Sequence, residues 1–123
     1  MRKRMFNTDS GFYKYMGKIF GSREIQRVTS DRFYDDDGKE WIMEISQNVV
    51  IAIISVKDSV IKNVYAEDVF CLAEILKEMR PEISIGIVTN LYREVYATAG
   101  YEIVEEKKNF VKIMGGKDIG KNQ

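Results

Sequence analysis

Between residues 59 and 89 the chain switches from a strand pattern to a helical pattern and back again. Residues 59–65 read as a strand, residues 68–80 place apolar side chains along one helical stripe, and residues 83–89 alternate. Pro81 ends the helix, because proline removes a backbone donor and clashes with the preceding turn. A strand, a crossover helix and a second strand predict a parallel pair in one sheet.

Further strand-like segments precede this unit. Residues 49–56 form a nearly continuous apolar run, which is typical of a central strand buried on both faces. Turns separate this run from residues 40–46 and 59–65, so the three segments predict an antiparallel meander. The other predicted elements are a helix at 9–20, a strand at 24–30, a helix at 90–99, and a hairpin of 101–107 with 109–114. This order predicts an α/β (α+β) fold with a mixed, mostly antiparallel central sheet and helices on both faces.

The length of 123 residues fits one domain with one substantial core. We expect a single domain over residues 1–114, followed by a flexible polar tail over 115–123. The single cysteine, Cys71, excludes an intrachain disulfide, and the longest apolar run is too short to span a membrane. No signal peptide can be read at the start, so we expect a cytoplasmic protein.

The charge balance argues against a polyanionic partner. Nineteen basic residues offset nineteen acidic ones, so no global field attracts nucleic acid or an anionic membrane. Residues 1–30 are locally basic and residues 31–48 are locally acidic, a pattern that a solvated surface explains. Aromatic and basic residues alternate within residues 12–15 and could stack nucleobases, but the face of the helix at 9–20 explains them better.

The sequence contains no histidine, which removes the commonest general base and nearly all zinc sites. Cys71 falls in the apolar stretch of the helix at 68–80, where a structural thiol is expected in preference to a nucleophile. The acidic segment 35–38 with Glu44 resembles a calcium loop only in part, because Phe33 would occupy the first ligand position. We therefore expect no metal.

The late part of the chain resembles a known family. Asn90 begins a segment in which Tyr96 stands four residues before Gly100 and Tyr101. This pattern, followed by a terminal strand, is similar to the late motif of the GNAT superfamily of acyl-CoA N-acyltransferases, over roughly residues 40–114. A helix ending in the same Tyr-x-x-x-Gly-aromatic pattern also arises as an ordinary C-cap, with the tyrosine packing the helix on the sheet.

The resemblance implies an acyl transfer from acetyl-CoA to an amine of a small molecule or a protein. It implies Tyr96 as general acid on the leaving thiolate, and Asn90 at the pantetheine arm. The thioester would lie between the strands at 59–65 and 83–89, so Val64 and Tyr65 would flank it. Independently, Glu67 beside this cleft could act as a base through water, although it also reads as a helix N-terminal charge.

One departure from the family opposes ordinary CoA binding. The family has a basic, glycine-rich loop after its fourth strand, whose backbone amides hold the pyrophosphate. Here residues 64–68 lead directly into the helix, and Glu67 and Asp68 are acidic. Each like-charge pair at close range costs about 1–4 kcal/mol at intermediate dielectric. Two hypotheses follow: a divergent N-acetyltransferase-like protein, or a non-catalytic binding module on the same scaffold that has lost CoA binding.

Overall fold

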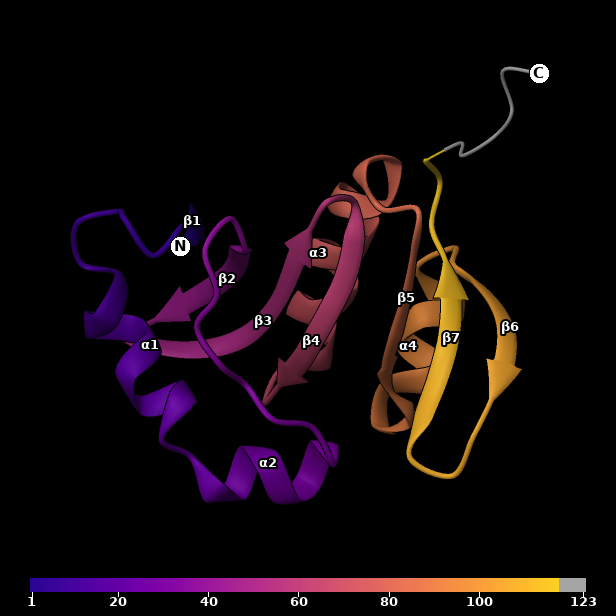
Figure 1. Ribbon diagram of the computed structural model, residues 1–123, viewed down its shortest axis with the longest axis horizontal. Helices are drawn as coiled ribbons and strands as arrows, with labels where there is room; N and C mark the ends of the chain where they lie inside the picture. The colour runs from indigo at the N-terminus through magenta and orange to yellow at the C-terminus, as the bar shows by residue number, and fades with distance from the viewer. Residues whose placement is uncertain (118–123) are drawn as a thin grey trace.

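The computed structural model describes residues 1–117, which form one seven-stranded sheet flanked by four α-helices (Figure 1). The strand order is β1-β2-β3-β4-β5-β7-β6. The strands are β1 (Arg2–Met5), β2 (Glu40–Ser46), β3 (Val49–Lys57), β4 (Val60–Ala66), β5 (Ile85–Thr89), β6 (Glu102–Glu106) and β7 (Phe110–Met114). The helices are α1 (Phe12–Phe20), α2 (Arg23–Thr29), α3 (Val69–Met79) and α4 (Arg93–Thr98), with short 3-10 turns η1 (Arg80–Glu82) and η2 (Asn90–Tyr92).

The predicted fold class is confirmed. Strands β2, β3 and β4 form the antiparallel meander, and β4 pairs in parallel with β5 after the crossover helix α3. All other neighbouring strands in the described sheet run antiparallel. The sheet is therefore mixed and mostly antiparallel, as the sequence predicts.

The two faces of the sheet carry separate hydrophobic clusters. Helices α3 and α4 cover one face, where Leu72, Leu76 and Tyr96 pack with Ile54 and Val88. Helices α1 and α2 belong to the other face, and the cluster there contains Phe12, Met16, Ile25, Trp41 and Ile53. Figure 1 shows the same division, with α1 and α2 around the meander and α3 and α4 behind the sheet. The central strands are thus buried on both sides.

Helix α3 is amphipathic, as its sequence predicts, but its buried stripe differs at the start. Leu72, Ile75, Leu76 and Met79 are buried, at spacings that fall on one side of a helix. Val69 and Phe70, the apolar residues that begin the helix, are 43% and 82% exposed.

We expect Leu76→Ala to lower the free energy of unfolding by roughly 2–5 kcal/mol, since the leucine is fully buried and its truncation leaves a cavity. Urea melts of both proteins give this value. Val69→Ala on the same helix is the matched control, because Val69 is exposed, and we expect a change below about 0.5 kcal/mol there. Equal effects of the two variants would show that the buried face of α3 is misassigned.

Two N-terminal predictions are wrong. The predicted strand at 24–30 is helix α2, which Ser22 caps by accepting a hydrogen bond from the Ile25 amide at 3.1 Å. Its loosely alternating pattern also fits a short helix that buries Ile25 and Thr29, four residues apart. Residues 2–5, read as a solvated basic start, instead form edge strand β1 against β2, where the Arg2 side chain pairs with Glu44 at 2.9 Å.

Residues 115–117 of the predicted tail are hydrogen-bonded to the rest of the chain. Backbone amides of Gly115, Gly116 and Lys117 donate to carbonyls of Ser84, Arg80 and Ile83 at 2.8–3.0 Å. These three residues are therefore part of the fold, and residues 118–123 of the predicted tail lie outside the described residues. The division into one domain over 1–114 stays a prediction.

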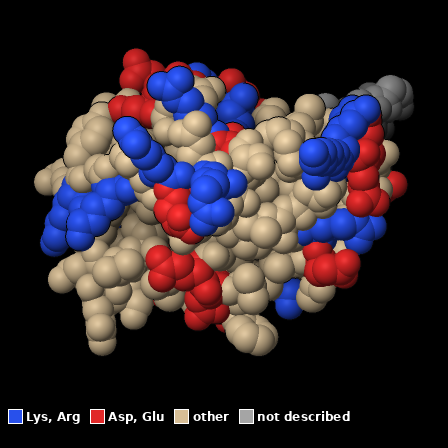
Figure 2. Space-filling model, turned by 90° about the horizontal axis from the view of Figure 1, so that it is seen from below, with Lys and Arg blue, Asp and Glu red and all other residues tan. Residues whose placement is uncertain are grey.

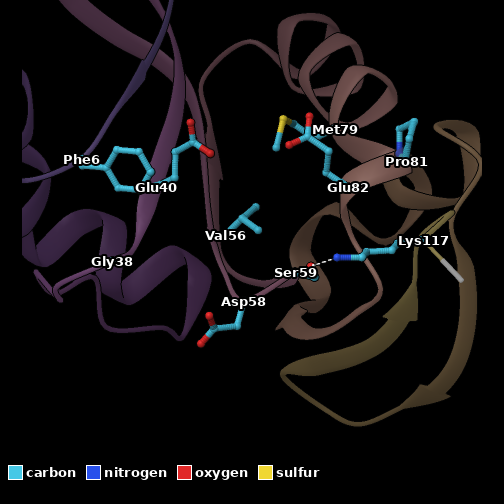
Figure 3. A pocket seen from close by; sticks show the side chains of 10 residues that line it. All are labelled: Phe6, Gly38, Glu40, Val56, Asp58, Ser59, Met79, Pro81, Glu82 and Lys117. Atoms are coloured by element: carbon cyan, nitrogen blue, oxygen red, sulfur yellow. Dashed lines mark hydrogen bonds between the residues drawn. The ribbon is translucent and has the colours of Figure 1, made fainter. Parts of the chain in front are cut away.

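The charged surface is mixed, and several of its charges are paired. On the face seen in Figure 2, Lys and Arg are interspersed with Asp and Glu, and both are separated by large areas of other residues. A hollow of about 450 Å³ at one end of the sheet is lined by Glu40 and Glu82 among others (Figure 3). Both carboxylates contact the Arg4 guanidinium, at 2.8 and 3.0 Å, and these bonds raise the Arg4 pKa. Two carboxylates that line this hollow are thus already paired with Arg4.

Candidate functional site

The parallel strands β4 and β5 pair only at their beginnings and then diverge. The register joins Val60 with Ile85 and Ile61 with Gly86, whereas β4 continues to Ala66 and β5 to Thr89. On its other side, β5 pairs with β7 along its whole length. Figure 1 shows the two strands parting toward their carboxyl ends. We call this diverging part of the two strands, residues 63–66 and 87–89, the wedge.

Local backbone features explain why the wedge starts where it does. A side chain at Gly86 would meet the Ile61 carbonyl oxygen at 2.4 Å, so glycine allows the close approach at the base. A bulge in the β3–β4 ladder lies beside Val56, just before the divergence. Because a bulge bends and twists its strand, it turns β4 away from β5.

Tyr92 bridges the open end of the wedge. It follows β5 in turn η2 and is 6% exposed. Its hydroxyl accepts a hydrogen bond from the Ala66 amide at 2.9 Å and donates one to the Ala66 carbonyl at 3.1 Å. Burial raises the Tyr92 pKa, and the bond to Ala66 opposes that rise. One side chain thus supplies the end of β4 with the two bonds that a neighbouring strand would supply.

Tyr96, the predicted general acid, lies in α4 and is fully buried. Its hydroxyl donates to the Thr89 carbonyl at the end of β5, at 2.7 Å. Burial raises the Tyr96 pKa well above its ordinary value, with smaller contributions from Tyr92 and Asp31. The phenol therefore keeps its proton through the neutral range.

The three predicted cofactor-binding residues lie around the wedge but face different ways. Val64 is buried in the cluster under α3 and α4, whereas Tyr65 packs against the cluster of α1 and α2, where burial raises its pKa. Asn90 follows β5, and its side-chain amide donates to the Lys107 carbonyl at 3.2 Å. Asn90 thereby fixes the turn between β6 and β7.

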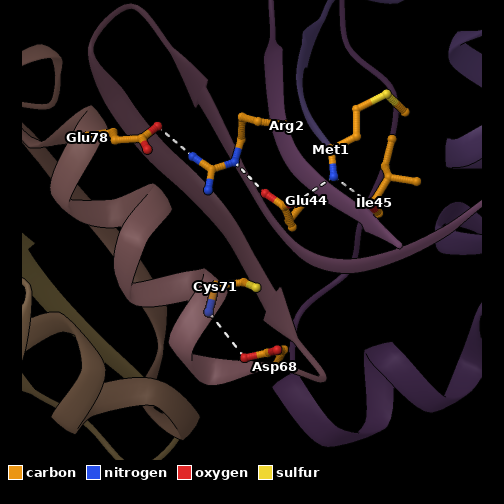
Figure 4. Close-up of polar contacts among 7 residues, drawn as sticks. All are labelled: Met1, Arg2, Glu44, Ile45, Asp68, Cys71 and Glu78. Carbon is orange, nitrogen blue, oxygen red and sulfur yellow. Dashed lines mark hydrogen bonds and ion pairs between the residues drawn. The ribbon is translucent and has the colours of Figure 1, made fainter. Parts of the chain in front are cut away.

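A carboxylate of the chain itself, that of Asp68, caps the start of α3. The Asp68 carboxylate accepts hydrogen bonds from the Phe70 and Cys71 amides at 3.0 and 3.2 Å. Figure 4 shows the bond from Cys71. Glu67 is exposed beside it, and the amides of both acidic residues donate to the Ile51 carbonyl. No hydrogen bond joins Glu67 with Tyr96 within residues 1–117. Two of the amides that could make this helix start an anion site, those of Phe70 and Cys71, are therefore already used.

No protein-family model and no curated protein matches the sequence. Two solved structures match most of the chain. An N-acetyltransferase from Staphylococcus aureus Mu50 is 14% identical, with a TM-score of 0.53 and a match over 92% of this chain and 93% of that one. The Campylobacter jejuni N-acetyltransferase PseH is 13% identical, with a TM-score of 0.50 and coverage of 92% and 94%. The chain has the GNAT fold. At this level of identity the likeness concerns the fold alone.

On the α1–α2 face of this GNAT fold lies a polar network that sequence reasoning missed. Asn63 of β4 is buried, and its side chain contacts Ser55, Lys39 and Asp31 at 2.7, 3.1 and 3.0 Å. Lys39 is only 1% exposed. Buried polar side chains need hydrogen-bond partners. The sequence could therefore have indicated this network through Ser55 and Asn63, two polar residues within largely apolar strands. Asp31 and Lys39 lie in a loop and carried no such signal.

Two further findings on residues 1–117 concern metal-binding groups and helices that could span a membrane. Within residues 1–117, no group of three or more His, Cys, Asp or Glu side chains is arranged to hold a metal ion. No helix in the same range is long and apolar enough to cross a membrane.

Proposed function

We propose that the protein is a divergent N-acyltransferase that transfers an acyl group from acyl-CoA to an amine. The wedge between β4 and β5 carries this proposal, because it lies beside a protonated, buried tyrosine at the end of β5. The GNAT fold of two N-acetyltransferases supports it as an acetyltransferase-like scaffold. A cytoplasmic location belongs to the same proposal and is supported by the single cysteine, Cys71.

In this proposal acyl-CoA supplies an activated thioester. The residues of the chain position that thioester, donate a proton to the leaving group and accept one from the amine. Val64 and Tyr65 flank the acyl group from β4, and Asn90 flanks the arm from the end of β5. Tyr96 holds the proton that the departing thiolate requires. Glu67, exposed at the end of β4, accepts through water the proton that the amine loses, so that no net charge accumulates.

The residues fit this donor only in part. Tyr92 closes the wedge by its two bonds to Ala66, so the ring has to leave before an arm can lie along β4. Asp68 caps α3 where a pyrophosphate would require free amides. These two observations favour a second candidate, a non-catalytic binding module that has lost CoA binding.

The direct experiment incubates the protein with acetyl-CoA and a panel of primary amines and follows release of free thiol. Thiol release that depends on both acetyl-CoA and an amine supports the acyltransferase. Absence of release, together with absence of acetyl-CoA binding by calorimetry, favours the binding module.

We expect Asp68→Asn to strengthen acetyl-CoA binding by roughly fivefold to tenfold at low salt, because one opposing charge is worth about 1 kcal/mol there. The gain should shrink at high salt as screening increases. Asparagine retains the N-cap, so helix stability is preserved. Calorimetry at two salt concentrations measures the effect, and Glu74→Gln, an exposed carboxylate one turn further along α3, is the control. An equal gain in both variants would refute a local effect at the helix start.

A further inference from the structure

A pocket of about 280 Å³ lies where the 31–39 loop meets the starts of β4 and β5 on the α1–α2 face. Its wall combines charged, amide, aromatic and apolar groups, namely Asp31, Tyr34, Lys39, Lys62, Asn63 and Ile87. Tyr34 is 49% and Ile87 64% exposed, so both offer apolar surface to a ligand. No residue that lines it has a role in the proposed acyl transfer, although Asn63 and Ile87 also lie where the wedge begins.

Asp31 is a half-buried carboxylate without a cationic partner. Its one side-chain hydrogen bond comes from the Asn63 amide at 3.0 Å, and it forms no ion pair within residues 1–117. Its backbone amide donates to the Thr29 hydroxyl at 3.2 Å, which fixes the residue at the end of α2. Burial raises the Asp31 pKa, although the bond from Asn63, a backbone bond from Arg32 and the nearby charge of Lys39 oppose that rise. A half-buried carboxylate of this kind gains from a ligand ammonium.

The pocket also has an excess of positive charge. Lys39 donates to the Tyr34 carbonyl at 3.2 Å and to Asn63 at 3.1 Å, and its ammonium lies 4.0 Å from the centre of the Tyr34 ring. Lys62 is exposed at the rim. Neither lysine forms an ion pair in the described chain. Two lysines against one aspartate disfavour a ligand that carries only positive charge.

We propose that this pocket binds a small zwitterion, with its ammonium on Asp31 and its anionic group on Lys62. Such a ligand satisfies the unpaired carboxylate and also offsets the extra positive charge, whereas a polyamine or a protein lysine side chain does only the first. If the protein is an acyltransferase, the zwitterion is the amine that accepts the acyl group. This acceptor role rests on the proposed function. The binding itself does not.

The test is a titration of the ¹⁵N-labelled protein, without any acyl donor, followed by the amide signals of Lys62 and Asn63. The probes are glycine, 4-aminobutyrate and 6-aminohexanoate, which span different charge separations, and n-butylamine and n-butyrate, which each keep one charge. We expect at least one zwitterion to bind about tenfold tighter than both single-charge probes, since a charge-assisted bond contributes about 1.5–3 kcal/mol. Asp31→Asn should remove that advantage. Asp37→Asn, an exposed aspartate of the same loop outside the pocket, should keep it.

The folding of Asp31→Asn can be checked independently. The folded-state pKa of Asp31 lies above its ordinary value of 3.8, so ionisation of this group costs stability. That cost is absent below the unfolded pKa and grows as the pH rises through the folded pKa. The variant should therefore be no less stable than the wild type at pH 7.

Each result decides a different question. Zwitterion binding without any acyl transfer supports the pocket and directs the function toward the binding module. Acyl transfer to other amines, with no zwitterion bound more tightly than butylamine and butyrate, overturns the pocket and leaves the acyltransferase standing. Retention of binding by Asp31→Asn also overturns it.

Discussion

Replacing Tyr92 by alanine is expected to open the wedge and to strengthen acetyl-CoA binding by about tenfold to a hundredfold. In the wild type a ligand must break both hydrogen bonds between Tyr92 and Ala66, each worth about 0.5–1.5 kcal/mol net, and displace a buried ring. The variant has neither the bonds nor the ring. Calorimetry with acetyl-CoA and with free CoA measures the change.

Alanine at this buried position also costs stability, roughly 3–5 kcal/mol for loss of an aromatic side chain. Tyr92→Phe is therefore the second variant, because it keeps the ring and removes only the bonds to Ala66. Hydrogen exchange of the Ala66 amide should accelerate in it. Tyr101→Phe is the control, since Tyr101 is also buried and donates to the Leu76 carbonyl at 2.6 Å away from the wedge. Folded Tyr92 variants that bind acetyl-CoA no better than Tyr101→Phe would show that Tyr92 does not block the wedge.

Tyr96→Phe is expected to lower acyl-transfer turnover by about 10²–10⁴-fold, the usual contribution of general acid catalysis. Phenylalanine keeps the packing of the ring and deletes only the hydroxyl. The variant should also lose about 1–3 kcal/mol of stability, because the buried Thr89 carbonyl loses its donor. Thiol release at saturating acetyl-CoA and thermal melts measure the two effects.

Tyr101→Phe again separates chemistry from folding. Tyr101 also donates to a buried backbone carbonyl, so its variant should lose similar stability but keep its turnover. If Tyr96→Phe retains as much turnover as Tyr101→Phe, the role of general acid is wrong. If Tyr96→Phe only loses stability and no activity is found in any variant, Tyr96 is a packing residue and the binding module becomes the leading function.

Together, the Tyr92 and Tyr96 variants distinguish the two candidate functions. An acyltransferase needs both a wedge that opens and a tyrosine that donates its proton. A binding module needs neither, and the bridge from Tyr92 to Ala66 then serves to hold the two halves of the sheet together. The zwitterion pocket is compatible with both, because it lies on the α1–α2 face and uses none of these groups.

The wedge could be anticipated only in outline. The sequence placed its walls in the strands at 59–65 and 83–89, and these strands are parallel neighbours. It gave no indication of Tyr92, because a tyrosine three residues after a strand reads as part of the next helix. That its hydroxyl meets Ala66, 26 residues earlier in the chain, depends on how far the strands diverge, and this divergence is a property of the twisted sheet.

The sequence by itself determined the meander, the crossover helix and the terminal hairpin, because local hydrophobic period and turn chemistry encode them. It also determined the acidic start of α3, where the neighbouring Glu67 and Asp68 can be read directly. Only the tertiary structure decided that residues 23–29 are a helix, that residues 2–5 add an edge strand, and that β7 lies between β5 and β6. Short segments with weak periodicity fit two conformations equally well, and contacts with distant residues select one of them. The same holds for Asp31 and Lys39 of the 31–39 loop and for Asn63 of β4, which form a pocket only once the fold has brought loop and strand together.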